Sequence, residues 1–455
     1  MEMTLEQIAA ATSGTARGGN PTAAGVSTDS RTVKAGNLFV ALDGENFDGH
    51  QFVGQALSGG AVAVMVNAAK AENISAPLVA VADTRRGLGE LAAAWRSQFD
   101  LPLIAVTGSN GKTTVKEMLA SICRAASSET AVLATEGNLN NDIGVPQMLF
   151  RLNRDHRFAV IEMGMNHPGE IDYLTRLARP SVALVNNAQS AHLQGLGTVE
   201  AVARAKGEIF SGLSQTGVAV INAEDPHAGM WRELAGTRRV IDFGLQSGAV
   251  NCSYSLQADG SALSLQTPAG AANVKLALPG LHNVRNALAA TAGALALGIA
   301  LPQIVAGLEA CHGAKGRLQR KAGCCGMTVI DDSYNANPGS VRAAIDVLAV
   351  QPGRRIMVLG DMGELGEQAE SMHAGIGRYA REKGLETFWT LGEMTRAAVD
   401  AFGAGGVHFG DLEALVSALL ERADAELTVL VKGSRFMRME RVVERLTVKG
   451  ESTCC

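Results

Sequence analysis

The chain has 455 residues, more than one hydrophobic core usually organises, so about three domains of ~150 residues each are expected. Hydrophobic residues make up 47% and charged residues 19%, which is ordinary for a soluble globular protein. The net charge of −5 lacks the basic excess of a nucleic-acid-binding protein, so no nucleic-acid partner is expected.

The first 83 residues contain short apolar runs separated by Gly, Asn and Asp, which predict short strands. These runs cover residues 38–42, 61–66 and 78–81. Ahead of them, Thr4 and Gln7 have the spacing of a capping box that opens a short amphipathic helix. The acidic N-terminus has no basic region, so it does not resemble a secretory signal. Asp83 is the predicted N-cap of the next helix.

After these strands, apolar runs alternate with helical stretches, which predicts a mostly parallel sheet covered by helices. The strands and the first helix are expected at residues 103–106, 115–123, 158–161, 182–185 and 218–221. Residues 250–280 have the pattern of antiparallel strands. The most apolar stretch, residues 287–301, is too short to span a bilayer and is predicted to be a buried helix.

A third α/β block begins near Gly316, with strand-like runs at residues 328–330, 356–359, 388–391 and 428–431. The predicted organisation is therefore α/β with domains at residues 1–83, 84–314 and 315–455. The seven cysteines are odd in number and form no CxxC pair, so reduced thiols are expected rather than disulfides or a metal site.

A glycine-rich motif follows the strand at residues 103–106 and precedes a helix, the context that a phosphate-binding loop requires. Its members are Thr107, Gly108, Ser109, Asn110, Gly111, Lys112, Thr113 and Thr114. Glycines in such a loop let the backbone approach phosphate, Lys112 is expected to reach the β- and γ-phosphates, and the Thr113 hydroxyl is expected to ligate Mg²⁺. The motif departs from the common form because Val106 stands where a glycine is usual. A glycine-rich turn without a nucleotide is the alternative, which the flanking strand and helix disfavour.

Three further residues lie at strand ends or on a helix of the same region. Glu162 ends the run at 158–161, where a carboxylate suits a metal ligand facing the phosphate loop. His192 follows another run, and Lys206 lies on a helical stretch. From the residues alone, a solvated turn, a structural histidine and a surface lysine remain alternatives for the three positions.

At this point several segments together resemble the Mur ligases, the ATP-dependent amino-acid and peptide ligases of peptidoglycan precursor synthesis. They are residues 27–31 (STDSR), 39–44 (FVALDG), 137–146 (GNLNNDIGVP), 206–210 (KGEIF), 282–286 (HNVRN), 331–338 (DDSYNANP) and 432–435 (KGSR). The phosphate loop, HNxxN and Lys-Gly-Glu elements are common to the family. The segments at 137–146 and 331–338 are more typical of the branch that adds D-alanyl-D-alanine to UDP-N-acetylmuramoyl-tripeptide. The Asp-Asn-Pro-Arg segment of the diaminopimelate-adding branch is absent.

The resemblance implies a UDP-sugar-binding domain, a central ATPase domain and a Rossmann-like third domain that helps to bind ATP and the incoming amine. It implies ATP and Mg²⁺ as requirements and an acyl-phosphate intermediate. It also implies small-molecule substrates, a cytoplasmic location, no membrane span and a monomer.

The resemblance also assigns roles to individual residues. Glu162, His192 and Thr113 are implied Mg²⁺ ligands, and Lys206 matches a lysine that is carbamylated in relatives and then holds a second Mg²⁺. Asn283 matches the adenine contact, Arg317 the arginine that reaches the ATP phosphates, and Asp332 the ribose-binding acid. Ser27, Asp29, Ser30 and Arg31 fall where the uridine diphosphate is expected, and Asn138, Asn140, Asn141 and Asp142 where the sugar-peptide chain is expected. The candidates for the dipeptide are Tyr334, Asn335, Asn337, Lys432, Ser434 and Arg435.

Three other functions compete with this interpretation. A sister ligase that adds a single amino acid, or a folylpolyglutamate synthase, shares the chemistry but differs in acceptor and amine. A P-loop protein that uses its nucleotide as a conformational switch would need no sugar-nucleotide domain ahead of the loop. A degenerate homologue that only binds is disfavoured because Lys112, Thr113 and Glu162 are intact, as are His192 and Lys206.

Overall fold

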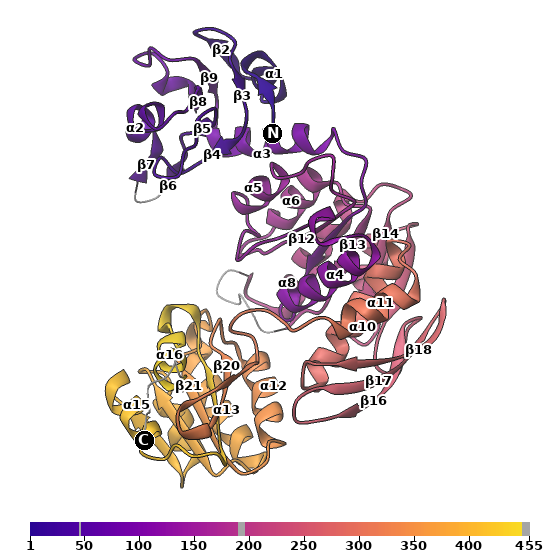
Figure 1. Cartoon of the computed structure of the whole chain (residues 1–455), viewed down its shortest axis with the longest axis vertical. Coiled ribbons are helices and arrows are strands. Elements are labelled where there is room, and N and C mark those ends of the chain that lie inside the picture. Colours follow the sequence, from indigo (N-terminus) through magenta and orange to yellow (C-terminus); the bar gives the residue numbers. More distant parts are fainter. Residues whose placement is uncertain (45–46, 190–195, 448–455) are drawn as a thin grey trace.

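The computed structural model describes residues 1–44, 47–189 and 196–447. Three α/β regions follow one another along the chain, from the N-terminal region through the middle region to the C-terminal region (Figure 1). This arrangement confirms the predicted α/β class and its three-part layout. Among the described residues, no helix is both long enough and apolar enough to cross a bilayer.

The N-terminal region is built on a five-stranded sheet in the order β2-β9-β8-β5-β4, parallel except for β2. Its strands are β1 (Met3–Thr4), β2 (Thr15–Arg17), β3 (Thr22–Ala23), β4 (Val26–Ser27), β5 (Leu38–Val40), β6 (Asp43–Gly44), β7 (Phe47–Asp48), β8 (Ala63–Asn67) and β9 (Leu78–Val81). Its helices are α1 (Leu5–Ala11) and α2 (Val53–Ser58), with short 3-10 helices at Gly49–Phe52 and Ala68–Lys70. The predicted capping box of Thr4 and Gln7 is confirmed at the start of α1.

The middle region contains a six-stranded, wholly parallel sheet in the order β11-β12-β10-β13-β14-β15. Its strands are β10 (Leu103–Thr107), β11 (Val132–Ala134), β12 (Phe158–Glu162), β13 (Val182–Val185), β14 (Val218–Asn222) and β15 (Arg239–Phe243). Its helices are α3 (Thr84–Arg96), α4 (Lys112–Ala126), α5 (Gly144–Leu149), α6 (Glu170–Ala178), α8 (Val199–Gly207), α9 (Ala228–Ala235), α10 (Leu281–Ala296) and α11 (Leu301–Glu309), with 3-10 helices at Glu129–Ala131 and Glu208–Gly212. A three-stranded antiparallel sheet, β16 (Asn251–Leu256), β17 (Ser261–Thr267) and β18 (Gly270–Leu276), confirms the pattern predicted for residues 250–280.

Two apolar clusters cover the two faces of this parallel sheet. On one face lie α4, α10, α11 and the three-stranded sheet. On the other lie α3, α5, α6, α8 and α9, and this cluster continues without interruption into the N-terminal region. Helix α3 begins at the N-cap predicted at Asp83, and its Leu88 and Leu91 belong to the shared cluster. Because the cluster crosses this point of the chain, the packing marks no boundary between residues 83 and 84, and the boundary predicted there stays a prediction.

The C-terminal region has a six-stranded sheet in the order β19-β20-β24-β21-β22-β23, parallel except for the edge strand β19. Its strands are β19 (Gln319–Ala322), β20 (Thr328–Asp332), β21 (Arg354–Gly360), β22 (Thr387–Leu391), β23 (Gly406–Phe409) and β24 (Leu427–Lys432). Its helices are α12 (Pro338–Ala349), α13 (Ala369–Glu382), α14 (Arg396–Phe402), α15 (Leu412–Leu420) and α16 (Glu440–Leu446), with 3-10 helices at Cys324–Gly326, Gly366–Gln368 and Arg435–Met437. One face is covered by α12, α13 and α14, and the other by α15 and α16.

The parallel strands of the middle region bring their carboxyl ends to one edge. In the β10–β12 pair Val106 faces Glu162, and in the β10–β13 pair Thr107 faces Val185. Because ligands of open parallel sheets bind beyond the carboxyl ends of the strands, this edge is where a functional site is expected.

Candidate active site

The phosphate loop occupies the turn between β10 and α4, as the sequence predicts. Gly111 is the N-cap of α4 and has φ +80°, a conformation that an L side chain rarely adopts. A Cβ at this position would lie 2.3 Å from Asn286 Oδ1 and 2.6 Å from Asn186 Nδ2. Both the backbone angle and the space therefore require glycine here. The N-terminus of α4 is the end of the helix at which an anion would bind favourably.

The Lys112 side chain folds back over this loop. Its Nζ donates to the Gly108 carbonyl at 2.7 Å and to the Ser109 carbonyl at 3.4 Å. Burial lowers the pKa of Lys112, Arg317 adds to the lowering, and the charge of Glu162 opposes it. A bound phosphate would supply the negative charge that the carbonyl oxygens lack, so the lysine is placed to exchange these contacts for a phosphate contact.

Glu162 joins the phosphate loop to the segment at residues 137–146. Its Oε2 accepts from the Thr113 hydroxyl at 2.9 Å, and its Oε1 accepts from Asn140 Nδ2 at 2.8 Å. The residue is only 2% exposed. A carboxylate beside a threonine hydroxyl is a set of hard oxygen donors, which fits the chemistry of Mg²⁺. The other implied metal ligand, His192, lies outside the described residues.

Lys206 is buried at the end of α8, against the sequence-based alternative of a surface lysine. Its side chain is 1% exposed, and burial together with the charge of Lys112 lowers its pKa well below the usual value for lysine. A buried ammonium is costly, so the neutral amine is favoured at this position. A neutral amine is also the form that reacts with carbon dioxide to give a carbamate.

A cleft of about 980 Å³ separates the middle region from the C-terminal region. The candidate nucleotide residues that line it come from both sides: Asn110, Gly111, Thr114, Asn283, Arg317 and Asp332. Arg317 lies over the ring of Tyr334, with its guanidinium carbon 4.5 Å from the ring centroid. Asp332 accepts from Lys432 Nζ at 2.6 Å, and burial raises the pKa of this carboxyl while Lys432 opposes the rise. The nucleotide residues predicted from two separate regions of the sequence therefore line one cleft in the structure.

The candidate uridine diphosphate segment follows β4 in the N-terminal region. The exposed Arg31 pairs with Asp29 at 2.7 Å, and this partner lowers the pKa of Asp29 to about 2. The Ser27 hydroxyl donates to the Asp29 carbonyl at 3.0 Å, and the Ser30 hydroxyl donates to Gln55 Oε1 at 3.1 Å. The guanidinium of Arg31 is exposed and has the planar geometry that suits a diphosphate, which would compete with Asp29 for its Nε and Nη2 groups.

The segment between β11 and α5 lies between this region and the phosphate loop. Asn141 Oδ1 accepts from the Gly144 amide at 2.8 Å, and Asp142 pairs with Arg85. Asn138 is exposed. From α5, the Gln147 amide donates to the Thr28 hydroxyl at 2.8 Å. With the Asn140 contact to Glu162, the segment runs from the candidate sugar-nucleotide residues to the candidate phosphate site.

The candidate dipeptide residues gather at the carboxyl ends of β20 and β24. Lys432 Nζ donates to the Asn335 carbonyl at 2.9 Å, and the Ser434 hydroxyl donates to the Ala336 carbonyl at 3.1 Å. Arg435 is exposed and pairs with Glu440 at 2.9 Å.

The sequence interpretation missed the loop at residues 361–366, which follows β21 and lies beside the loops that follow β20 and β24. The Gly363 amide donates to the Ser434 hydroxyl at 2.8 Å, and the Ser434 amide donates to the Asp361 carbonyl at 2.9 Å. Glu364 in this loop has φ +62°, which is rare for a residue with a side chain. The available signal was a polar, glycine-containing stretch directly after a buried strand.

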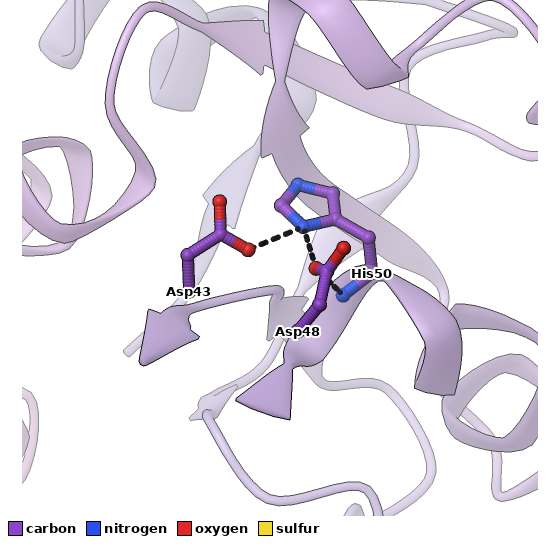
Figure 2. Close-up of side chains that lie close together, drawn as sticks. All are labelled: Asp43, Asp48 and His50. Atoms are coloured by element: carbon purple, nitrogen blue, oxygen red, sulfur yellow. Dashed lines mark hydrogen bonds and ion pairs between the residues drawn. The ribbon is translucent and has the colours of Figure 1, made fainter. Parts of the chain in front are cut away.

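A separate cluster of Asp43, Asp48 and His50 lies in the N-terminal region, and Figure 2 shows both carboxylates directed at the imidazole. His50 Nε2 accepts from the Asn67 amide at 2.9 Å, so its Nδ1 carries the proton and donates to Asp48 at 2.7 Å. Lys70 Nζ bonds both carboxylates, at 3.1 Å to Asp43 and 2.9 Å to Asp48. The cluster is a satisfied network that ties the β6–β7 hairpin to β8, and its imidazole has no lone pair to offer a metal.

Comparison with known families matches three models in order along the chain. They are the Mur ligase family catalytic domain at residues 22–96, the Mur ligase middle domain at residues 106–294, and the Mur ligase, glutamate ligase domain at residues 316–435. The chain belongs to the Mur ligase family. The resemblance inferred from the motifs is thereby confirmed, and the chain is an ATP-dependent ligase.

Three relatives within the family match over 92% or more of each chain. The UDP-N-acetylmuramoyl-tripeptide--D-alanyl-D-alanine ligase of Escherichia coli (strain K12) is 43% identical, and the alignment covers 100% of each chain. A crystal structure of MurF from Acinetobacter baumannii has a TM-score of 0.92 at 39% identity and covers 98% of each chain. A MurF ligase from Thermotoga maritima in complex with ADP has a TM-score of 0.83 at 28% identity, covering 92% of this chain and 96% of the other.

Proposed function

We propose that this Mur ligase joins D-alanyl-D-alanine to UDP-N-acetylmuramoyl-tripeptide with cleavage of ATP to ADP and phosphate. The observation that carries the proposal is the position of Glu162, which contacts Thr113 of the phosphate loop and Asn140 of the segment typical of this branch. Two ligases of that name are 43% and 44% identical to the chain and cover 100% and 93% of it. Together these observations support both the chemistry and the choice of substrates.

The chemistry begins with activation of the acceptor, because a carboxylate does not react with an amine at neutral pH. The terminal carboxylate of the tripeptide attacks the γ-phosphorus of ATP, which forms an acyl phosphate and releases ADP. The free amine of the dipeptide then attacks the acyl carbon, loses a proton, and expels phosphate as the amide bond forms. Lys112 offsets charge on the transferring group, and Arg317 reaches it from the opposite wall of the cleft.

Positioning supplies much of the catalysis in this proposal, because three substrates converge from three regions. Asn283 would contact the adenine and Asp332 the ribose, while Arg31 would hold the diphosphate of the acceptor. The cleft between the middle and C-terminal regions would exclude water from the acyl phosphate when the nucleotide fills it. The residues around Lys432 and Ser434 would hold the dipeptide.

We include Mg²⁺ as the metal, held by Glu162 and Thr113, with His192 as the third predicted ligand. When bound, the ion supplies positive charge beside the β- and γ-phosphates. The buried Lys206 would be carbamylated, since its neutral amine can bond to carbon dioxide with loss of a proton. Enzyme prepared with ¹³C-labelled bicarbonate should give a carbamate resonance that is lost in Lys206→Met, and equal spectra would sink the modification.

The reaction is tested with purified protein, ATP, Mg²⁺, UDP-N-acetylmuramoyl-tripeptide and D-alanyl-D-alanine, with each substrate omitted in turn. The expected result is phosphate release that requires both acceptor and dipeptide, together with the mass of the pentapeptide product. Turnover with a free amino acid in place of the dipeptide would move the chain to a sister branch. ATP hydrolysis that ignores every acceptor would overturn the ligase assignment.

The cellular setting proposed with this reaction is the cytoplasm, where the small-molecule substrates are made. The proposed working form is a monomer, because one chain carries all the candidate residues. Cross-linking or light scattering at working concentration measures the oligomeric state, and a stable dimer would contradict this part of the proposal.

A further inference from the structure

The first turn of α12 lies directly against the phosphate loop. Asn337 is the N-cap of this helix, and its Oδ1 accepts from the Ser340 amide at 2.9 Å. Its Nδ2 donates to Asn110 Oδ1 in the phosphate loop at 2.8 Å. One amide side chain therefore caps a helix of the C-terminal region and at the same time contacts the loop of the middle region.

Gly339, the second residue of α12, also lies close to the phosphate loop and to Gln189. A Cβ on Gly339 would lie 2.7 Å from Gln189 Oε1 and 3.3 Å from Asn110 Nδ2. The first of these distances is shorter than real Cβ contacts, so a side chain here would displace the end of the Gln189 side chain, which accepts from Asn110 Nδ2. The glycine therefore leaves room for Gln189 to hold Asn110 beside the capped end of the helix.

On the other side of this contact, Asn110 is held at each of its polar groups. Its amide donates to Asn187 Oδ1 at 2.9 Å, and its carbonyl accepts from Asn186 Nδ2 at 2.9 Å and Asn187 Nδ2 at 3.0 Å. Its side-chain Nδ2 donates to Gln189 Oε1 at 2.6 Å. A shift of Asn110 would break several of these hydrogen bonds at once and change the shape of the loop. A residue that bonds Asn110 from the C-terminal region can therefore affect that shape.

The same network continues to the candidate adenine contact. Asn186 Nδ2 also donates to Asn286 Oδ1 at 3.0 Å, and Asn286 Nδ2 donates to Asn283 Oδ1 at 3.2 Å. These two side chains are buried, and Gly111 of the phosphate loop packs against Asn186 and Asn286. Side-chain amides therefore connect the C-terminal region, the phosphate loop and the base side of the cleft.

We propose that Asn337 is a positioning residue that docks the C-terminal region onto the phosphate loop and couples nucleotide binding to closure of the cleft through Asn110. The role rests on the proposed function, and it differs from the dipeptide contact predicted for this residue from the sequence. In the docked state Asn337 holds Asn110, and through it the loop, in the shape that receives the phosphates. The loss of this contact leaves both regions folded but lowers the affinity of the chain for the nucleotide.

A double-mutant cycle on the full chain tests the coupling, with ADP affinity measured by titration calorimetry. Asn337→Ser keeps a helix cap but is too short to reach the loop, and Asn110→Ala removes the acceptor. Each single change should weaken ADP binding by about 5-fold, as expected for one hydrogen bond. The double variant should be no weaker than the weaker single variant. Effects that multiply in the double variant, or an unchanged affinity in Asn337→Ser, would overturn the coupling.

The matched control is Asp411→Ser, which changes the N-cap of α15 in the same region. It should leave the affinity for ADP unchanged, so a loss of affinity in this variant would mean that any weakened cap has the same effect. Steady-state kinetics add a second readout. At saturating ATP, Asn337→Ser should still lower kcat, because a misplaced loop slows transfer as well as binding; a change in KM alone would contradict the positioning role.

The ADP cycle does not require turnover, which separates the two proposals. A chain that binds ADP with coupled variants but forms no pentapeptide would contradict the proposed substrates and leave the docking role supported. If the chain forms the pentapeptide but the losses of ADP affinity in the two single variants multiply in the double variant, only the docking role would be contradicted.

Discussion

The middle region meets its two neighbours through junctions of opposite character. Toward the N-terminal region the junction is apolar, because one buried cluster runs from Leu5 and Val40 through Leu88 and Leu91 into Ile171. Toward the C-terminal region the apolar clusters do not cross, since those of that region contain only residues from 318 onward. Contact there depends on polar groups around a cleft of about 980 Å³.

The polar junction consists of a few hydrogen bonds at the two ends of the cleft. Near the phosphate loop Asn337 bonds Asn110, and at the turn between β16 and β17 the Gln351 amide donates to the Ala258 carbonyl at 2.8 Å. Burying apolar area stabilises a junction by roughly 25 cal/mol per Å², whereas a hydrogen bond adds only about 1 kcal/mol net. The comparison indicates that one junction is fixed and the other can open for substrates, as expected of small polar interfaces between domains.

Lys112→Ala in the phosphate loop, beside the polar junction, should change activity more than any other substitution considered. Without this cation on the transferring phosphate, turnover should fall by about 10³-fold, equivalent to ~4 kcal/mol of transition-state stabilisation. The melting temperature should not fall, because a partly desolvated charge has been removed. The ligation assay and a thermal melt measure both quantities. Lys275→Ala at an exposed position is the control, and equal losses in the two variants would contradict the role of Lys112.

The matching change at the apolar junction is Leu91→Ala in α3. Leu91 is fully buried in the shared cluster, so its truncation should lower the free energy of unfolding by about 2–5 kcal/mol. Turnover per folded molecule should stay near that of the unmodified chain. Urea unfolding provides the measurement, with Leu420→Ala, which is 36% exposed, as the comparison variant expected to change stability by under ~0.5 kcal/mol. If Leu91→Ala lost activity and kept its stability, the apolar junction would not have the stabilising role inferred for it.

The polar junction should also respond to pH through His282, which lines the cleft. Burial, with help from Lys432 and Arg285 and against Asp346, lowers the pKa of His282 to about 4 from 6.5. Between these values the unfolded chain binds more protons than the folded chain, so stability falls as the pH falls from 6.5 to 4. The slope should be less than about 1.4 kcal/mol per pH unit, because the imidazole keeps some contact with solvent.

Urea unfolding at several pH values compares His282→Gln with the unmodified chain. The variant should lose this part of the pH dependence, so the difference in stability between the two proteins should change steadily below pH 6.5. Parallel curves over the whole range would show that His282 takes up its proton equally in both states.

The smallest effect is expected from Gln351→Ala at the far end of the cleft. The side chain is buried and bonds Ala258, but the loss of one hydrogen bond should lower stability by only about 1 kcal/mol. Solution scattering is the sharper measurement, because the radius of gyration of the nucleotide-free chain should rise as the cleft opens. An unchanged radius would contradict a role for Gln351 in holding this end of the cleft closed.

Short-range sequence patterns were sufficient to predict many of the local elements and the motifs. The capping box at Thr4, the N-cap at Asp83 and the strand–loop–helix around Lys112 follow from short-range patterns, and the structure confirms each of them. The family also followed from the motifs, because its segments keep their order and spacing along the chain. Roles such as the Mg²⁺ ligands and the dipeptide contacts remain predictions.

The environment that distant groups share could not be predicted from local patterns, because it depends on how the regions pack. Lys206 has the sequence pattern of a surface lysine, yet α8 packs it into the interior, where burial lowers its pKa. Asn110 and Asn337 are far apart in sequence and meet only because two separate sheets direct their carboxyl ends toward one cleft. The loop at residues 361–366 becomes part of the site through Ser434. Local patterns encode which backbone forms, whereas burial, electrostatic environment and contact between regions depend on how distant segments pack.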